Sequence, residues 1–147
     1  EDLRQEFNLP GMAILQFAFD HFEDNPHKPA NITPDTIAYT GTHDNDTCVG
    51  WFHGLDPHTK DFVFHVLGVA PSDDIADLMV RVAMDSRAQL AIAPLQDYLG
   101  LGGESRMNTP GVGEGNWRWQ FDWDMLSDGL AGHIRQVIDA SGRSHAS

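Results

Sequence analysis

Apolar runs alternate with amphipathic stretches along this sequence, and the alternation predicts an α/β fold. A nearly continuous apolar run over residues 12–19, behind Pro10 and Gly11, is typical of a strand buried on both faces of a parallel sheet. We expect a second strand over residues 36–41 and a third over residues 90–95. Strands separated by helices pair in parallel through right-handed crossovers, so all three should lie in one parallel sheet.

Helical periodicity fills the space between the second and third strands. Residues 58–68 carry apolar side chains at helical spacing and end at Gly68, a residue type that commonly stops helices. Residues 72–89 predict a stronger helix, with Ser72 as N-cap and acidic residues in its first turn. Its apolar positions share one face and are Ile75, Leu78, Met79, Val82 and Ala83. A last helix is expected over residues 127–140, followed by a frayed tail over residues 141–147.

Three strands make an incomplete sheet of this kind. The two outer strands would present bare edges, which invite pairing with other strands. A complete (β/α)8 TIM barrel needs about 250 residues, whereas this chain has 147. We expect the missing strands upstream, so that residues 1–147 could supply the last strands of such a barrel.

The charge of the chain narrows the classes of partner. Nine Lys and Arg residues against 22 Asp and Glu residues give a net charge of −13, which repels nucleic-acid phosphates and anionic lipid headgroups. No stretch approaches the roughly 18 apolar residues of a membrane span, and the start EDLRQEF is too acidic for a signal peptide. We therefore expect a cytoplasmic protein with no nucleic-acid or membrane partner. The single cysteine, Cys48, is interpreted as a small buried hydrophobe.

Polar residues follow each predicted strand at the point where it ends. Asp20 follows the first strand, His43 and Asp44 follow the second, and Gln96 and Asp97 follow the third. Chemistry in α/β barrels gathers at the C-terminal ends of the strands. The sequence therefore predicts a polar site at this edge of the sheet.

Asp44 has structural alternatives to a functional role. It could be the N-cap of a helix that begins at Asn45, because Asp and Asn both cap well. Together with His43 and Asp46 it could hold a metal, although adjacent side chains rarely converge and no partner lies at ligand spacing. The glycine-rich residues 100–116 could cradle a phosphate, but no Lys-Ser/Thr follows them as in a P-loop, which favours a flexible loop.

Aromatic residues alternate after this loop. Trp117, Trp119 and Trp123 are more often packing residues than a binding platform. Sugar rings stack well on exposed indoles, so a carbohydrate platform stays open as the second interpretation.

Four sequence blocks carry a specific resemblance. They are LPGMAILQFAFD, YTGTHDNDTCVGWF, APLQDYLGLGGESRMNTPG and GNWRW, and they extend from Leu9 to Trp119. In this order they closely resemble the C-terminal part of the amylomaltases, the bacterial and plastid 4-alpha-glucanotransferases. The resemblance implies an eight-stranded α/β barrel related to the α-amylases. It also implies transfer of 1,4-α-glucan segments between maltooligosaccharides, with glucose able to act as acceptor.

The same resemblance indicates which catalytic groups this chain lacks. Members of the family use a retaining mechanism with a carboxylate nucleophile and a second carboxyl as acid and base. The nucleophile stands in an Arg-x-Asp-His context, which does not occur here. The acid/base glutamate stands in a Glu-Asp-Leu-Gly motif, whereas Arg4 follows Glu1-Asp2-Leu3 in this chain. We expect the chain alone to be inactive and to require the missing N-terminal part of the same barrel.

The resemblance assigns the third acidic residue of the family's site to Asp44. It implies that Asp44 hydrogen-bonds the 2- and 3-hydroxyls of the sugar and favours the oxocarbenium-like transition state. His43 would donate to the same hydroxyls. Further candidates for glucan binding or loop ordering lie in the matching blocks and are Asp20, Gln96, Asp97, Asn108, Asn116 and Trp117. The residues contain no nucleotide motif, so no cofactor is expected, and no metal is expected either.

Two other functions stay open at this point. A non-catalytic glucan-binding module would use Trp117, Trp119 and the loop before them. A relative of the α-amylases could instead hydrolyse its substrate, releasing reducing sugar where a transferase forms new oligosaccharides.

Overall fold

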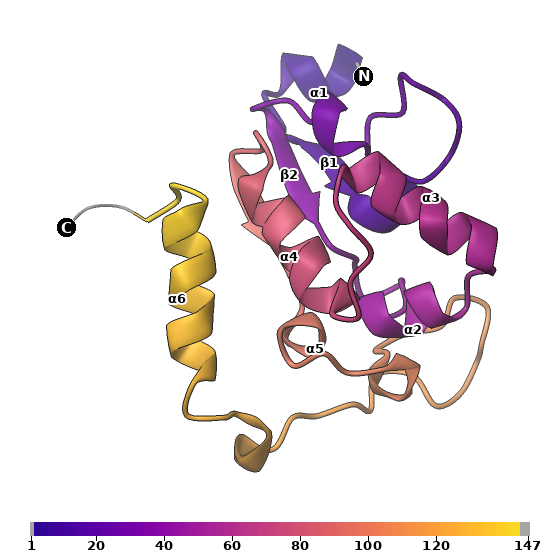
Figure 1. Cartoon of the computed structure of the whole chain (residues 1–147). Coiled ribbons are helices and arrows are strands. Elements are labelled where there is room, and N and C mark those ends of the chain that lie inside the picture. The colour runs from indigo at the N-terminus through magenta and orange to yellow at the C-terminus, as the bar shows by residue number, and fades with distance from the viewer. Residues whose placement is uncertain (1, 145–147) are drawn as a thin grey trace.

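A three-stranded parallel sheet covered by helices on one face forms the centre of the molecule (Figure 1). The structure is a computed structural model that describes residues 2–144. The strands are β1 (Gly11–Ile14), β2 (Thr36–Tyr39) and β3 (Leu90–Ile92), in the order β1-β2-β3. Both pairings are parallel, which confirms the predicted sheet.

Each strand is shorter than the apolar run that predicted it. The first predicted strand extended to Phe19, but β1 ends at Ile14 because the chain turns into a short 3-10 helix, η1 (Leu15–Phe17). The amide of Ala18 donates to the carbonyl oxygen of Leu15 and closes this turn. Beyond β3, Pro94 has no N–H group with which to continue the ladder. The segments after the strands are therefore free to form turns at the edge of the sheet.

The helices include the three predicted over residues 58–68, 72–89 and 127–140, in the predicted order. They are α1 (Asp2–Glu6), α2 (Cys48–His53), α3 (Pro57–Leu67), α4 (Ile75–Asp85), α5 (Leu95–Tyr98) and α6 (Leu130–Ala140). Three further short 3-10 helices are η2 (Pro29–Asn31), η3 (Gly103–Ser105) and η4 (Trp123–Met125). The last predicted helix begins three residues late, at Leu130, with no side-chain hydrogen bond at its cap.

Of two helix ends predicted from local sequence signals, one is confirmed and one is wrong. Gly68 has a φ of 68° after α3, in the left-handed conformation that suits a glycine stop, as predicted. The predicted N-cap of α4, Ser72, is wrong because Asp74 accepts the hydrogen bond from the amide of Asp77. The Ser72 hydroxyl instead accepts from the amide of Asp74, just before the helix begins.

One face of the sheet packs against α3 and α4. The register aligns Ala13 with Ala38 and Ala38 with Ala91, so small side chains lie across this face. Ala13 and Ala38 are fully buried in a core with Val63 of α3 and Met79 of α4. The small alanines allow both helices to approach the strands closely, and the core lies in this layer.

The opposite face of the sheet is only partly covered by the described residues. Successive side chains of a strand point to opposite faces, so Met12, Ile37 and Leu90 share this side. Met12 is 55% exposed, Leu90 48% and Ile92 39%. The expectation of a strand buried on both faces is therefore wrong at Met12, whereas Ile14, two residues further on the same face, is 9% exposed. Some apolar side chains on this open face thus have no cover from the described residues.

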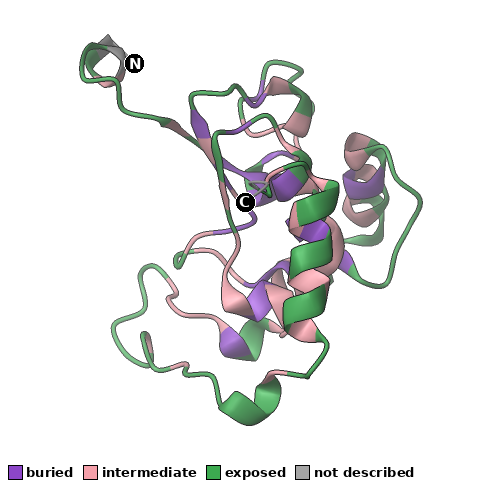
Figure 2. Cartoon of the chain, turned by 90° about the vertical axis from the view of Figure 1, so that its left-hand side faces the viewer, coloured by how far each residue is buried: buried purple, intermediate pink, exposed green. Residues whose placement is uncertain are grey.

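The C-terminal helix α6 lies alongside α4 (Figure 1), and its outer surface is largely exposed (Figure 2). Val137 is buried against Val80 and Met84 of α4. Beyond the helix, the Arg143 guanidinium donates to the carbonyl oxygens of Met84, Ser86 and Ala88. The predicted fraying is thus not seen at Arg143, and residues 145–147 lie outside the described residues. No helix within residues 2–144 is long and apolar enough to cross a membrane.

Candidate functional site

A tight turn after β2 carries the predicted site residues. The amide and the hydroxyl of Thr42 both donate to Oδ1 of Asn45, at 2.9 and 2.8 Å. The amide of Asn45 donates back to the carbonyl oxygen of Thr42 at 3.0 Å. Gly41 precedes the turn, and a Cβ atom there would lie 2.7 Å from Nε2 of Gln16. A larger residue where β2 enters the turn would therefore require the Gln16 side chain to move.

The turn leads directly into α2. Thr47 is the N-cap of this helix, because its hydroxyl oxygen accepts from the amide of Gly50 at 3.0 Å. The alternative in which Asp44 caps this helix is therefore wrong. Asp44 lies three residues earlier, in the turn itself, and its carboxylate is free of any capping role.

Asp97 lies beneath the turn and is 3% exposed. Its Oδ2 accepts from the hydroxyl of Thr40 at 2.6 Å, and its Oδ1 accepts from the amide of Cys48 at 2.8 Å. One carboxylate thus joins the end of β2, the start of α2 and α5. Burial, together with the negative charge of Asp97, holds the pKa of the Cys48 thiol well above its usual range. Cys48 is fully buried, as predicted.

Two buried glutamines fix the neighbouring backbone. Nε2 of Gln96 donates to the carbonyl oxygen of Ser105 at 3.2 Å, which ties α5 to η3. Nε2 of Gln16 donates to the carbonyl oxygen of Asp46 at 2.8 Å, which ties the end of β1 to the turn after β2. The segments after all three strands are thereby held together at one edge of the sheet.

Asp44 is the exposed carboxylate at this edge. Its side chain is 52% exposed, and its Oδ1 accepts from Nδ2 of Asn108 at 2.6 Å. Nε2 of His43 lies 3.5 Å from the same oxygen. The amide of Asn108 also donates to the carbonyl oxygen of His43 at 3.1 Å. Among the described residues none donates to Oδ2 of Asp44, so this oxygen is available to accept from a ligand.

Arg106 joins the same two segments and was missed by sequence reasoning. Its Nη2 donates to the carbonyl oxygen of Asp44, and its Nε donates to that of Asn108, both at 2.7 Å. Arg106 belongs to one of the four sequence blocks, but nothing in its spacing reveals partners that are backbone carbonyls. The carbonyl oxygen of Met107, also missed, accepts from the amide of Trp117 at 2.7 Å.

Trp117 borders the site next to His43. The residue is 61% exposed, and its ring centroid lies 5.1 Å from that of His43. Its φ of 62° is rare for a bulky residue, because the left-handed region crowds the Cβ atom. Such backbone strain persists where surrounding contacts impose it. Trp117 is therefore held at the edge of the site and is not a core residue of this chain.

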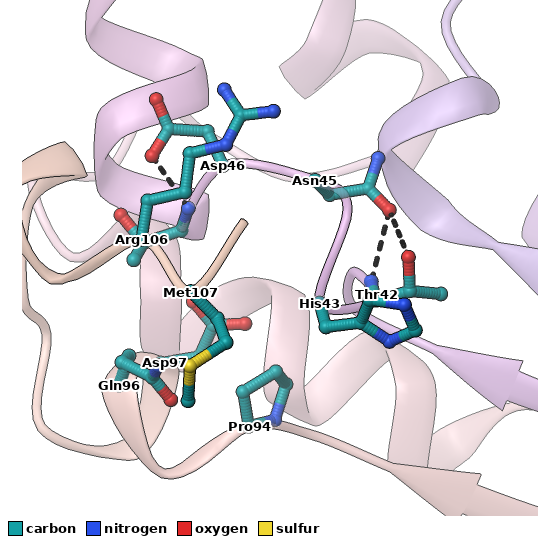
Figure 3. A pocket seen from close by; sticks show the side chains of 10 residues that line it. Thr42, His43, Asn45, Asp46, Pro94, Gln96, Asp97, Arg106 and Met107 are labelled. Carbon is teal, nitrogen blue, oxygen red and sulfur yellow. Dashed lines mark hydrogen bonds between the residues drawn. The ribbon is translucent and has the colours of Figure 1, made fainter. Parts of the chain in front are cut away.

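A cavity of about 170 Å³ opens between these segments (Figure 3). It is lined by Thr42, His43, Asn45, Asp46 and Thr47 from the turn, Pro94, Gln96 and Asp97 after β3, and Arg106 and Met107 from the long loop. Figure 3 shows His43 on the side opposite Asp46 and Arg106. Asp44 is bonded to residues of this rim but lies outside the lining itself.

Two of the sequence-predicted residues order loops instead of facing the cavity. Asp20 accepts from the amide of Phe22 and from Nδ2 of Asn25, and the bond from Asn25 is the main cause of its lowered pKa. Asn116 accepts from the amide of Thr109 and donates to the carbonyl oxygen of Val112. Of the two roles considered for Asp20 and Asn116, glucan binding and loop ordering, their contacts in this structure fit loop ordering.

The remaining predicted residues form a rim and a floor. The exposed His43, Asp44 and Trp117 and the half-buried Asn108 make the rim, and Gln96 and Asp97 lie buried beneath it. The rim combines a carboxylate acceptor, amide and imidazole groups and an indole face, which suits a neutral ligand rich in hydroxyl groups. Within residues 2–144, no group of three or more His, Cys, Asp or Glu side chains converges as a metal site would require.

Comparison with known proteins gives consistent similarities. A family model described as 4-alpha-glucanotransferase matches residues 1–126. The 4-alpha-glucanotransferase of Synechocystis sp. is 46% identical over 144 residues, which cover 97% of this chain and 28% of that protein. A chloroplastic or amyloplastic 4-alpha-glucanotransferase of Arabidopsis thaliana is 43% identical over 145 residues, covering 97% of this chain and 25% of that protein.

A solved structure is similar in three dimensions. The amylomaltase of Streptococcus agalactiae in complex with acarbose superposes with a TM-score of 0.91 at 30% identity, covering 98% of this chain and 29% of that one. The chain thus spans between a quarter and a third of the length of these relatives.

Proposed function

This chain belongs to the 4-alpha-glucanotransferase family, and from that premise we propose that it forms part of an enzyme that transfers 1,4-α-glucan segments between maltooligosaccharides. The resemblance found in the four sequence blocks is confirmed by the family match. A protein of the relatives' length that includes this chain is called the full-length protein. Its donor and acceptor would be α-glucans, because the similar amylomaltase binds acarbose.

The chain is proposed to supply the last three strands of an eight-stranded α/β barrel. Inward-facing positions of such barrels are filled by bulky apolar side chains, and the helices cover the outside. The open face carries Met12, Leu90 and Ile92, whereas the opposite face carries alanines under α3 and α4. This asymmetry supports an open face that is covered by the N-terminal part of the same barrel.

Asp44 is proposed to accept hydrogen bonds from the sugar ring in the transition state. Its Oδ1 is held by Asn108, so Oδ2 is oriented and available to accept from the 2- and 3-hydroxyls. Those hydrogen bonds strengthen as positive charge develops on the ring, which lowers the barrier selectively. His43 lies next to Asp44 and would donate to the same hydroxyls, and Trp117 would offer an apolar face beside them. One observation carries this proposal: at the strand ends, Asp44 has one carboxylate oxygen hydrogen-bonded to Asn108 and the other without a donor among the described residues.

The chain alone is proposed to be inactive. Retaining glycoside chemistry requires two carboxyl groups about 5 Å apart, one as nucleophile and one as acid/base. The motifs that carry these two groups in the family do not occur in this sequence. Hydrogen bonds to hydroxyls have no bond-breaking step to assist without that pair.

Incubation with maltotriose tests both statements. The full-length protein should produce longer and shorter oligosaccharides, while the 147-residue chain at equal concentration should leave maltotriose unchanged. Turnover by the chain alone would refute its proposed inactivity. Release of reducing sugar without longer products from the full-length protein would indicate a hydrolase.

The alternative of a non-catalytic glucan-binding module is not favoured by the family match, which is to transferases. The cytoplasmic location stays a prediction, since the Arabidopsis relative is named as chloroplastic or amyloplastic.

A further inference from the structure

Arg106 is a cationic side chain of the site whose role neither the sequence motifs nor the proposed chemistry explains. It lies in the long loop between α5 and α6, which has regular structure only at η3 and η4. Its two hydrogen bonds end on backbone carbonyls of residues that the site uses. A guanidinium at this point offers no group that could react with a sugar, so its contribution must come through Asp44 and Asn108.

The contacts form a closed triangle. Arg106 donates to the carbonyl oxygens of Asp44 and Asn108, each at 2.7 Å, and the Asn108 side chain donates to the Asp44 carboxylate at 2.6 Å. Hydrogen bonds from a charged guanidinium are stronger than neutral ones, and its planar fork fixes the angle between the two acceptors. The triangle therefore sets both the backbone and the side chain of Asp44 relative to the long loop.

We propose that Arg106 is a positioning residue that holds Asp44 and Asn108 in the geometry required for transition-state binding. The proposal rests on the transferase function proposed above. Asp44 lies in a turn that its neighbours Thr42 and Asn45 close, with no helix or strand to support its peptide group. Loss of the guanidinium frees the Asp44 carbonyl, and displacement of a reacting group by about 1 Å can cost about 100-fold in rate.

Kinetics of the full-length protein test this role. Arg106→Ala should lower kcat for maltotriose disproportionation by about 10- to 100-fold while KM changes less than about threefold, because the affected contact strengthens in the transition state. Arg106→Lys should recover only part of the loss, since an ammonium cannot span both carbonyls with fixed geometry. Arg135→Ala, on the exposed side of α6, is the matched control and should leave kcat unchanged. Full activity of Arg106→Ala would overturn the proposal.

A double-mutant cycle shows whether the effect passes through Asp44. In an Asp44→Asn background, Arg106→Ala should cost less than about threefold, because the residue that it positions no longer acts. An equal loss in both backgrounds would mean that Arg106 acts independently of Asp44, and would overturn the proposal even if the single variant is impaired.

Hydrogen exchange gives a readout that needs no activity. The Asn108 amide donates to the His43 carbonyl oxygen at 3.1 Å, and its exchange in Arg106→Ala should be about tenfold faster, as expected for loss of a supporting charge-assisted hydrogen bond. Unchanged exchange at Asn108 would overturn the positioning role. If the wild-type full-length protein shows no transfer at all, the proposed function fails, and this exchange measurement still decides the positioning role separately.

Discussion

The floor and the rim of the site each contain an acidic residue just beyond a strand end, and the two are built in opposite ways. Asp97, after β3, is 3% exposed and accepts from Thr40 and Cys48, one donor on each oxygen. Asp44, after β2, has a side chain that is 52% exposed. One of its oxygens accepts from Asn108, and the other accepts from no described residue.

The contrast shows that position at a strand end does not by itself make a carboxylate functional. A buried carboxylate must have its hydrogen bonds satisfied within the protein, and Asp97 uses both oxygens to join three elements. Asp44 keeps one oxygen open while the other fixes its orientation. We infer that the floor is built for stability and the rim for binding, and substitutions in each can test this division.

Asp44→Asn in the full-length protein should give the largest effect. Loss of the charge that stabilises the developing oxocarbenium should lower transfer by about 100- to 1,000-fold. The melting temperature should barely change, because Asp44 is exposed and Asn can still accept from Asn108. The two measurements are product analysis with maltotriose and thermal denaturation. Near-normal transfer by this variant would remove Asp44 from the site.

Asp97→Ala should do the reverse and destabilise the fold. It leaves the Thr40 hydroxyl and the Cys48 amide buried without their acceptor, at a cost of about 1–3 kcal/mol each. Thermal or urea denaturation of the full-length protein should show a clear loss. Asp97→Asn should be milder, because the Thr40 hydroxyl can rotate to accept from the new amide. A wild-type melting temperature for Asp97→Ala would contradict the structural role of Asp97.

Gly41→Ala tests the junction between floor and rim. The added methyl group would lie 2.7 Å from Nε2 of Gln16 and 3.2 Å from Cβ of Asn45. Such overpacking costs about 1–3 kcal/mol, and it should also displace the Asp44 turn and reduce transfer. Gly113→Ala is the matched control, because a Cβ atom at Gly113 meets nothing within 4 Å. Equal behaviour of the two variants would show that the turn tolerates the displacement.

The partly buried Asp77 provides an intermediate case and the smallest effect. Arg81 and His133 lie 2.6 and 2.7 Å from its carboxylate oxygens, at hydrogen-bond distance. Burial raises the pKa of Asp77, but the bonds from Arg81 and His133 outweigh it, so its pKa lies below the ordinary value. Its stabilisation is therefore present above the unfolded pKa of about 3.9 and is lost as pH falls through the lower folded pKa.

Acid denaturation measures that contribution. For a partly exposed ion pair we expect less than about 1 kcal/mol. Asp77→Asn should lower the free energy of unfolding at about pH 6. The difference in this free energy between variant and wild type should shrink as pH falls below about 4. An unchanged difference across this range would show that the link between α4 and α6 does not depend on the Asp77 charge.

Local patterns predicted the framework of the fold because they depend on neighbouring residues. The apolar face of α4 was found in part: Ile75, Met79 and Ala83 are buried, and Leu78 and Val82 are partly buried. The buried Ala76, Val80 and Met84 of the same helix were not predicted. The length of β1 was not, because an apolar run looks the same in a strand as in the 3-10 turn after Ile14. The open face of the sheet was also missed, since an apolar run does not show whether residues of the same chain cover both faces of a strand.

The sequence predicted that polar residues gather where the strands end, but not which groups each of them contacts. Asp44 and Asp97 look alike along the chain, and only long-range hydrogen bonds separate them. Asp97 meets Cys48 across 49 positions, and Arg106 meets the Asp44 carbonyl across 62. Partners that are backbone groups leave no trace in residue type, which is why sequence reasoning missed Arg106.

A crystal structure of the full-length protein with acarbose bound would show whether the open oxygen of Asp44 binds sugar. We predict that Oδ2 of Asp44 lies within about 2.6–3.2 Å of a sugar hydroxyl, while Oδ1 still accepts from Asn108. A well-ordered acarbose in the cleft whose rings leave the Asp44 carboxylate facing only solvent would contradict the proposed role.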